Sequence, residues 1–366
     1  LYADLGWILA HGGNPYVDVL GSFGGPFAAY VDQFWAGHGV AYPPLALEVN
    51  RLAVQLGGMH PYWGVVAQRI PAALGMGLIA TFLPRLADQL RVERQWAIWL
   101  GVLNPIAVVH LIGGAHNDTL MAGVVVVALW LSLQRTPHVS ASLVWAPILI
   151  GVAMALKQQA GLAVIAAAGL PVAARLVRLP HLQRIAVLGW RTAVAAVVAL
   201  VTFVVVSLAT GLGFGWTLWL GEMGRARTLT LSVAIGDAFA WTGHDLTGAA
   251  GTAIAVLALG GLAALLLLRP ERPLEVTAWG SLLVLGIGQA LHPWYVGLSL
   301  ALLSLVPLRR TTARWVVFCT IGYLIAYCMN NLYNAAVLAS IAVGVLVGTG
   351  AFALWVARGE RPTRLG

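Results

Sequence analysis

The sequence contains few charged residues, a single lysine and two cysteines. Of its 366 residues, 9% are charged and 60% are hydrophobic, whereas a soluble globular domain carries roughly 25% charged residues. Such a low charge content excludes a set of soluble domains with a water-facing surface of this size. Apolar runs of about 20 residues recur from residue 62 to residue 356, and each is long enough to cross a bilayer. We therefore predict an all-α polytopic membrane protein with about eleven transmembrane helices.

Other features are also absent. Cys319 and Cys328 lie in one apolar run, where they would face opposite sides of a helix, so they predict no disulfide framework. No Walker motif, dinucleotide fingerprint or nucleophile elbow occurs in a suitable context, which argues against nucleotide-driven chemistry. The sequence opens at Leu1 without a basic signal region, so we expect a truncated start with residues missing upstream.

The apolar runs and the arginines together predict a topology. Candidate spans lie near residues 62–82, 97–112, 119–134, 142–156, 160–176, 187–211, 246–268, 275–290, 296–308, 313–329 and 333–356. Alternate loops between them carry Arg85, Arg91, Arg94, Arg135, Arg175, Arg178, Arg184, Arg269, Arg272, Arg309, Arg310, Arg314, Arg358, Arg361 and Arg364. By the positive-inside rule these loops are cytoplasmic. The net charge of +8 therefore indicates membrane topology and not nucleic-acid binding.

The remaining loops are predicted to lie outside a plasma membrane. Glycine, proline, aspartate and aromatic residues interrupt residues 1–61, which we interpret as an external loop with short interfacial helices that follows a missing first span. Residues 62–366 then form the transmembrane helical domain, with a second external loop at 212–245. Most of the polar residues suited to chemistry lie on this outer side, where we expect the working face.

The first candidate site is the run from Gly113 to Asp118, at an outer turn between two spans. Two glycines permit a tight turn, after which His116, Asn117 and Asp118 present hydrogen-bonding groups suited to sugar hydroxyls. Alternatively, Asp118 caps the helix that follows. The two roles are compatible.

The second candidate is Lys157 with Gln158, placed between two apolar runs on the outer side. A lone external lysine departs from the positive-inside pattern, and a phosphate-bearing substrate would explain it. The alternative is a snorkelling lysine at a helix end. Arg225 and Arg227 offer a second cationic pair on the same side, unless they belong to a solvated loop.

The third candidate is the turn formed by His292, Trp294 and Tyr295 around a proline. Aromatic rings beside polar groups are typical of carbohydrate sites, and also of the aromatic belts at membrane interfaces. A belt explains the two aromatic residues but not the histidine. His110, His116 and Asp118 match no standard metal-site spacing, so we predict no metal site.

The fourth candidate is a set of carboxylates in the first external loop. Asp4, Asp18 and Asp32 lie there beside the Asn14-Pro15-Tyr16 and Tyr42-Pro43-Pro44 stretches. A partly buried carboxylate in a site that excludes water would serve as a general base. The alternative for each of the three is a structural role.

Taken together, these residues resemble the bacterial polyprenol-phosphate-mannose-dependent α-1,6-mannosyltransferases, a family in the GT-C class of membrane glycosyltransferases. The resemblance covers nearly the whole chain. It rests on residues 12–16, 42–45, 104–105, 113–118 and 292–295, and the His-Asn-Asp turn is its most specific part.

The resemblance implies a GT-C-like helical bundle that transfers mannose from polyprenyl-phosphomannose to a glycolipid or mannan acceptor on the outer face. The expected linkage is α-1,6 with inversion, and the scheme requires no metal and no cofactor beyond the lipid-linked donor. In the resembled family an aspartate precedes the position of Leu1, so the family's base is expected upstream of this sequence. Asp4, Asp18 and Asp32 are then the first-loop candidates that remain.

Two other function classes stay open. A carrier for a lipid-linked sugar or small solute would use a similar bundle, with polar groups nearer the bilayer midplane. Arg69 and Arg191, which lie inside predicted spans, favour that alternative. A non-catalytic scaffold would tolerate replacement of the outer histidines, aspartates and lysine.

Overall fold

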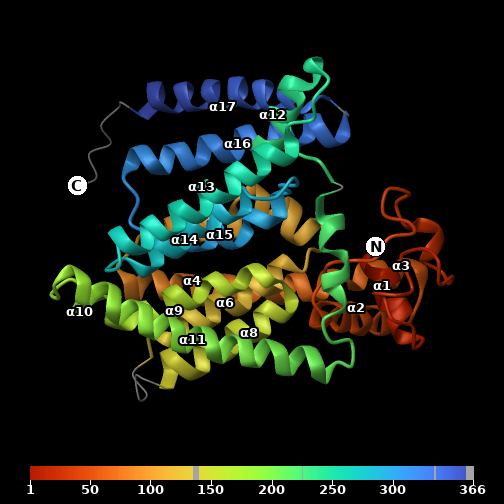
Figure 1. The fold of residues 1–366 in the computed structure, drawn as a ribbon, viewed down its shortest axis with the longest axis horizontal. Coiled ribbons are helices and arrows are strands. Elements are labelled where there is room, and N and C mark those ends of the chain that lie inside the picture. The colour runs from red at the N-terminus through yellow and green to blue at the C-terminus, as the bar shows by residue number, and fades with distance from the viewer. Residues whose placement is uncertain (135–139, 225, 334, 360–366) are drawn as a thin grey trace. The chain divides into compact units, whose positions relative to one another are not determined.

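The computed structural model describes residues 1–134, 140–224, 226–333 and 335–359 (Figure 1). These residues form helices and connecting loops, with no strand among them. Six helices are long and apolar enough to cross a membrane, and a seventh crossing results if the pair Arg94–Leu103 and Ile106–Gly113, bent by 44°, is one span. The protein is therefore a multi-pass helical membrane protein, as the composition predicts.

Each predicted span coincides with an apolar helix of the structure. Four of these helices have fewer than 18 residues and are short for a full crossing: Asp118–Ser132, Ala141–Leu156, Pro273–Leu285 and Pro293–Leu303. The predicted number of eleven crossings therefore stays a prediction. The first span is longer than expected, because Pro61–Leu90 extends past Pro84 and includes Arg85 within the helix.

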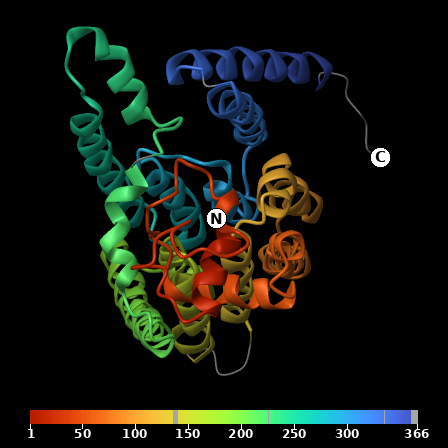
Figure 2. The same ribbon diagram turned by 90° about the vertical axis from the view of Figure 1, so that its right-hand side faces the viewer.

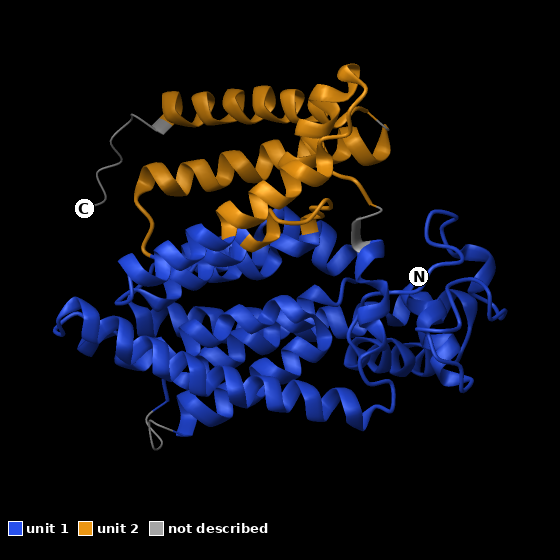
Figure 3. Ribbon diagram, in the orientation of Figure 1, with its two compact units in different colours: residues 1–223, 259–283, 294–306 blue, residues 224–258, 284–293, 307–366 orange. Residues whose placement is uncertain are grey.

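The chain divides into two compact units (Figure 3). Unit 1 comprises residues 1–223, 259–283 and 294–306, and unit 2 comprises residues 224–258, 284–293 and 307–366.

Unit 1 is built on a helical bundle. It contains α3 (Pro61–Ala67), α4 (Arg69–Leu90), α5 (Arg94–Ile98), the π-helical η2 (Trp99–Leu103) and η3 (Ile106–Gly113), α6 (Asp118–Ser132), η4 (Ala141–Trp145), α8 (Ala146–Leu156), η5 (Gln158–Leu162), α9 (Ala163–Gly169), η6 (Leu170–Val172), α10 (Ala173–Leu176), α11 (His181–Ala209), η7 (Gly215–Gly224), α14 (Pro273–Leu285) and α15 (Gly297–Leu303). In Figures 1 and 2, α4, α6, α8 and α11 run side by side.

Residues 1–60 cover one end of this bundle in both views, and we call this the covered end (Figures 1 and 2). They contain α1 (Tyr2–Ala10), η1 (Ala28–Tyr30) and α2 (Pro44–Leu56). Pro44 occupies the first turn of α2, where its missing N–H breaks no hydrogen bond. Leu5, Leu20 and Leu47 form a buried core within the segment, so the predicted loop is a packed layer with helices of its own.

The connections between helices alternate between the two ends of the bundle. The turn at residues 114–117 and Lys157 lie at the covered end, because α6 begins there and α8 ends there. The opposite end carries Arg91, Arg94, Arg175, Arg178 and Arg184 in the described part of the chain, and we call it the arginine end. This separation is the one expected from the positive-inside pattern.

Close packing of α4 against α6 fixes the position of the covered end. A Cβ added at Gly75 would meet the carbonyl oxygen of Thr119 at 2.4 Å, and one added at Gly123 would meet the carbonyl oxygen of Gly75 at 2.5 Å. The two backbones therefore touch, as small residues permit in membrane helix pairs. This contact holds the first turn of α6 in place.

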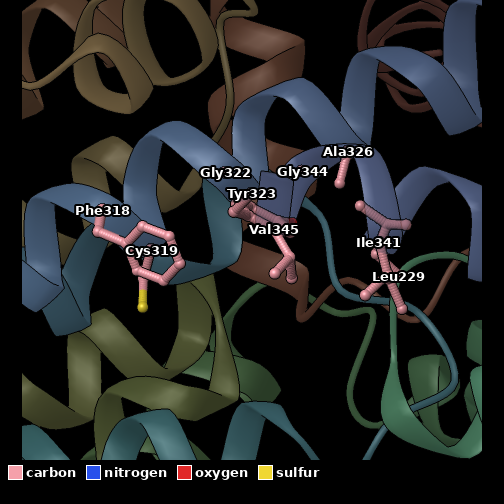
Figure 4. Close-up of a pocket in the computed structure, with 9 residues that line it drawn as sticks. All are labelled: Leu229, Phe318, Cys319, Gly322, Tyr323, Ala326, Ile341, Gly344 and Val345. Carbon is pink, nitrogen blue, oxygen red and sulfur yellow. The ribbon is translucent and has the colours of Figure 1, made fainter. Parts of the chain in front are cut away.

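Unit 2 contains α12 (Leu231–Phe239), η8 (Ala240–Thr242), the first part of α13 (Thr247–Leu268), α16 (Arg310–Leu332) and α17 (Val337–Gly359). The helices α16 and α17 pack closely through Gly322 and Gly344. A cavity of about 220 Å³ lies beside this contact (Figure 4), and its lining comprises Leu229, Phe318, Cys319, Gly322, Tyr323, Ala326, Ile341, Gly344 and Val345. This lining is almost entirely apolar.

Candidate functional site at the covered end

The His-Asn-Asp turn is rigidly held. Ala115 adopts a left-handed conformation with φ of 56°, and the hydroxyl of Thr119 donates to the carbonyl oxygen of Leu111 at 3.1 Å. Asn117 is the N-cap of α6 but makes no side-chain capping bond. Asp118 is the first residue of α6, and its carboxylate contacts Lys157.

Asp118 and Lys157 form a buried ion pair. The ammonium Nζ of Lys157 lies 2.6 Å from Oδ1 of Asp118, and the two side chains are 12% and 1% exposed. The amide of Gln159 donates to the same Oδ1 at 3.3 Å. The other carboxylate oxygen, Oδ2, is buried and has no hydrogen-bond partner among the described residues. The pair therefore joins the start of α6 to the end of α8 and keeps one acceptor available.

The environment of Lys157 is aromatic and dry. Its ammonium lies 4.1 Å from the centroid of the Tyr295 ring, within the range of a cation–π contact. Burial lowers the pKa of Lys157, and the negative charge of Asp118 opposes that shift. A cation with so little contact with water interacts strongly with any anion that enters the site.

A second group of contacts surrounds His116. Its ring stacks on Trp294, with centroids 3.7 Å apart and an interplanar angle of 12°. Its Nδ1 lies 3.0 Å from the hydroxyl of Tyr2, which in turn lies 3.3 Å from the hydroxyl of Tyr42. Burial raises the pKa of Tyr42 to about 12, so this phenol stays neutral at physiological pH. The orientation of the His116 ring is thus fixed by the stacking on Trp294 and by the contact of Nδ1 with Tyr2.

Residues 1–60 are attached to the bundle by hydrogen bonds near these groups. The side chain of Gln158 donates to the carbonyl oxygen of Ala41 at 3.2 Å. The hydroxyl of Tyr16 donates to the carbonyl oxygen of Tyr42 at 2.7 Å. The indole N–H of Trp219 donates to the carbonyl oxygen of Tyr16 at 3.0 Å. The Asn-Pro-Tyr and Tyr-Pro-Pro stretches therefore position Tyr42 beside Tyr2.

The three first-loop carboxylates have different surroundings. Asp4 is buried, accepts a hydrogen bond from the backbone N–H of Gly21 at 2.9 Å, and keeps Oδ1 without a partner in the described residues. Burial raises the pKa of Asp4. Asp18 accepts from the backbone N–H of Asn14 at 2.7 Å, and the exposed Asp32 from that of Phe34 at 2.8 Å. Both of these bonds stabilise local turns.

Two predicted residues do not belong to this group. Arg225 lies outside the described residues. His292 belongs to unit 2, where its Nδ1 lies 3.1 Å from the hydroxyl of Tyr327. The hydroxyl of Tyr323 donates to the carbonyl oxygen of Leu291 at 2.7 Å, which fixes the neighbouring backbone.

The site therefore combines a buried cation, a carboxylate, an oriented imidazole and aromatic rings at the covered end of unit 1. The residues predicted from the sequence that lie at this end of unit 1 in the structure are His116, Asn117, Asp118, Lys157, Gln158, Trp294 and Tyr295. Tyr2 was not predicted from the sequence. Its contact with His116 joins residues that are 114 positions apart. No local pattern distinguishes Tyr2 from the other aromatic residues of the first segment.

Known proteins similar to the chain include a solved structure and several enzymes. The crystal structure of ArnT from Cupriavidus metallidurans bound to undecaprenyl phosphate matches with a TM-score of 0.44 and 17% identity, over 96% of this chain and 70% of that one. Alpha-(1->6)-mannopyranosyltransferase A of Corynebacterium glutamicum is 32% identical over 162 residues, which are 44% of this chain and 32% of that protein. The protein of the same name from Mycobacterium tuberculosis is 28% identical over 335 residues, 85% of this chain and 62% of that protein.

The chain thus spans from about a third to about three fifths of the length of these relatives. Residues 1–174, which contain α1 to α9 and most of the site, match the family described as "Alpha-(1->6)-mannopyranosyltransferase, N-terminal domain". Over these residues the chain is similar to the α-(1→6)-mannopyranosyltransferase family.

Proposed function

We propose that the protein is a membrane mannosyltransferase. It transfers mannose from polyprenyl-phosphomannose to a growing lipid-linked mannan or lipoglycan, with inversion at the anomeric carbon and an α-1,6 linkage. The names of the relatives in Corynebacterium glutamicum and Mycobacterium tuberculosis support the sugar and the linkage. No metal or cofactor takes part in the proposed scheme.

The observation that carries the proposal is the buried cation of Lys157 beside Asp118 and Tyr295. A buried ammonium at a membrane edge is costly to maintain without a function. The donor supplies one, because its phosphate is an anion and its sugar presents hydroxyls. The unpartnered Oδ2 of Asp118 accepts a hydrogen bond from one such hydroxyl in this proposal.

The proposed reaction is a single displacement. A carboxylate base takes the proton of an acceptor hydroxyl, whose oxygen forms a bond to the anomeric carbon while the bond from that carbon to the phosphate oxygen breaks. Both electrons of the broken bond leave with the polyprenyl phosphate, whose growing negative charge Lys157 stabilises. One base is sufficient, because no sugar–enzyme intermediate forms. Asp4, Asp18 and Asp32 are the candidate bases in this chain, and the raised pKa of Asp4 suits proton transfer best.

The proposed site faces the outside of the plasma membrane. The positive-inside rule assigns the arginine end of unit 1 to the cytoplasm, and the covered end is the opposite end of the same bundle. A lipid-linked donor would then enter the site laterally from the outer leaflet.

The test uses membranes that contain the chain together with any sequence that flanks it in its native protein. They are incubated with radiolabelled polyprenyl-phosphomannose and a short α-mannoside, and the product linkage is determined by methylation analysis. We expect label in an α-1,6-linked product. Lys157→Ala should lower the rate by about 100-fold, because it removes the group that stabilises the leaving phosphate.

The control variant is Arg94→Ala, which removes one positive charge at the arginine end, where the side chain is 61% exposed. It should keep the wild-type rate. No transfer by a folded protein would overturn the proposed function, and an unchanged rate in Lys157→Ala would remove that residue from it.

A carrier for lipid-linked sugar is the second candidate. The bent pair Arg94–Leu103 and Ile106–Gly113 and the buried Arg191 favour it, because broken helices and intramembrane charges form transporter sites. Counterflow of labelled polyprenyl-phosphomannose across sealed vesicles without acceptor would support the carrier, whereas transfer that requires acceptor would support the enzyme.

A further inference from the structure

Unit 1 contains a buried arginine that does not belong to the candidate site at the covered end. Arg191 of α11 is 7% exposed. Its Nε donates to the carbonyl oxygen of Ala168 in α9, and its Nη2 donates to the hydroxyl of Ser142 in η4, both at 2.8 Å. The guanidinium therefore lies where three helical segments meet. The candidate site does not use it.

This arrangement leaves the charge of Arg191 uncompensated. Both acceptors are neutral, and none of the carboxylates in the described residues forms an ion pair with Arg191. The adjoining residues 135–139, whose placement is not described, contain no aspartate or glutamate. Neutral acceptors satisfy the N–H groups but do not offset the cost of removing a cation from water, so buried charges are nearly always paired.

A charge of the same sign acts on Arg191. The guanidinium of Arg175, in α10, acts electrostatically on Arg191, and Arg175 also forms no ion pair within the described part of the chain. The contrast is Arg184, at the same end of the bundle, whose Nη1 lies 3.4 Å from the carboxylate of Glu271. Carboxylates are thus available at this end, but not to Arg175 and Arg191.

We propose that Arg191 and Arg175 form a binding site for a phosphate group, with Ser142 as an additional contact. A phosphate carries the negative charge that the two arginines lack, and its oxygens match the planar fork of a guanidinium. Arg175 lies at the arginine end, which membrane topology places beside a lipid headgroup layer, and Arg191 lies deeper, in the first half of α11. Basic sites between transmembrane helices on that side bind anionic lipid headgroups. The site is independent of the mannosyltransferase proposal.

The two phosphate sources are separated by experiment. The full chain is purified in detergent, and its thermal unfolding midpoint is measured after addition of phosphatidylglycerol, phosphatidylcholine or inorganic phosphate. Ligands that bind only the folded state raise the midpoint. We expect a rise of at least about 2 °C with phosphatidylglycerol and none with phosphatidylcholine. An equal rise with inorganic phosphate would mean that the site takes the free anion as well.

Three variants decide the assignment. Arg175→Gln changes an exposed side chain, so it should fold and lose at least half of the rise. Arg191→Lys keeps the charge but not the planar fork, and should weaken the response. Arg94→Gln, at the same end but with its own carboxylate partner Asp88, should keep the full rise. A full rise in Arg175→Gln, or no rise in the wild type with either phosphate source, would overturn the proposal.

Discussion

At the residue scale, the buried pair of Asp118 and Lys157 is the most informative feature. Each residue was predicted from its own surroundings, one as a sugar-binding group and the other as a phosphate-binding group. Their contact across 39 positions was not predicted. Spacing along a sequence predicts neighbours on one helix, but it does not predict which ends of two different helices meet.

The pair also makes a stability prediction. Lys157→Met should leave the carboxylate of Asp118 buried and unpaired, and should destabilise the protein by about 3–5 kcal/mol. Adding Asp118→Asn should recover much of the lost stability, because the double variant buries no charge at this position. Thermal unfolding in detergent would measure both effects. If the double variant were no more stable than Lys157→Met, the ion pair would not be the source of the loss.

Asp4 provides a prediction for pH dependence. Burial raises the pKa of Asp4 above 3.8 in the folded protein. Folding therefore favours the protonated carboxyl group over the carboxylate. The contribution of this group is therefore fully present below pH of about 4 and is lost as the pH rises through the raised pKa. Asp4→Asn keeps an acceptor for the N–H of Gly21 but cannot ionise. Its stability relative to the wild type should increase between pH 4 and pH 7, as followed by unfolding midpoints at several pH values. A difference that stays constant over this range would contradict the prediction.

At the element scale, the helices were predicted better than their interruptions. Apolar runs locate each helix because burial in a bilayer demands an unbroken apolar surface. The π-helical segments η2, η3 and η4 were not predicted, since they result from packing and have no distinct periodicity. In the sequence, Asn104-Pro105 is only one of the stretches shared with the resembled family. It marks the bend between η2 and η3, where Oδ1 of Asn104 accepts the N–H of Ile106 at 2.8 Å.

The α4–α6 contact offers a test at this scale. Gly123→Leu places a side chain against the backbone of Gly75, where a Cβ alone would come within 2.5 Å of its carbonyl oxygen. The helices must then separate, and the start of α6 moves with Asp118. We expect lower stability, and a loss of the proposed transfer activity that is larger than the loss of stability alone explains. Gly77→Leu is a matched control, because a Cβ at that position of α4 meets nothing within 4 Å.

At the scale of the whole molecule, the distribution of arginines predicted two sides before any helix was placed. The structure of unit 1 agrees with that division, since the predicted outer turns gather at the covered end. Which end faces the cytoplasm stays a prediction, as does the total number of crossings.

Cysteine labelling tests the orientation. In a variant with Cys319 and Cys328 replaced by alanine, Val17→Cys introduces a thiol on a residue 71% exposed in the first segment, and Leu182→Cys introduces one on a residue 79% exposed at the arginine end. A membrane-impermeant maleimide should label intact cells through position 17 only. Both positions should react after the cells are opened. Labelling of position 182 in intact cells would reverse the proposed orientation.

Because Lys157 is the only lysine in the chain, the molecule has a natural reporter for occupancy of its candidate site. Reductive methylation with formaldehyde adds mass to amines, and apart from the chain terminus this protein offers one target. Burial lowers the pKa of Lys157, so its amine loses its proton at a lower pH than a solvent-exposed lysine does. Mass spectrometry should therefore detect methylation of that single side chain, and saturation with a polyprenyl phosphate should suppress it.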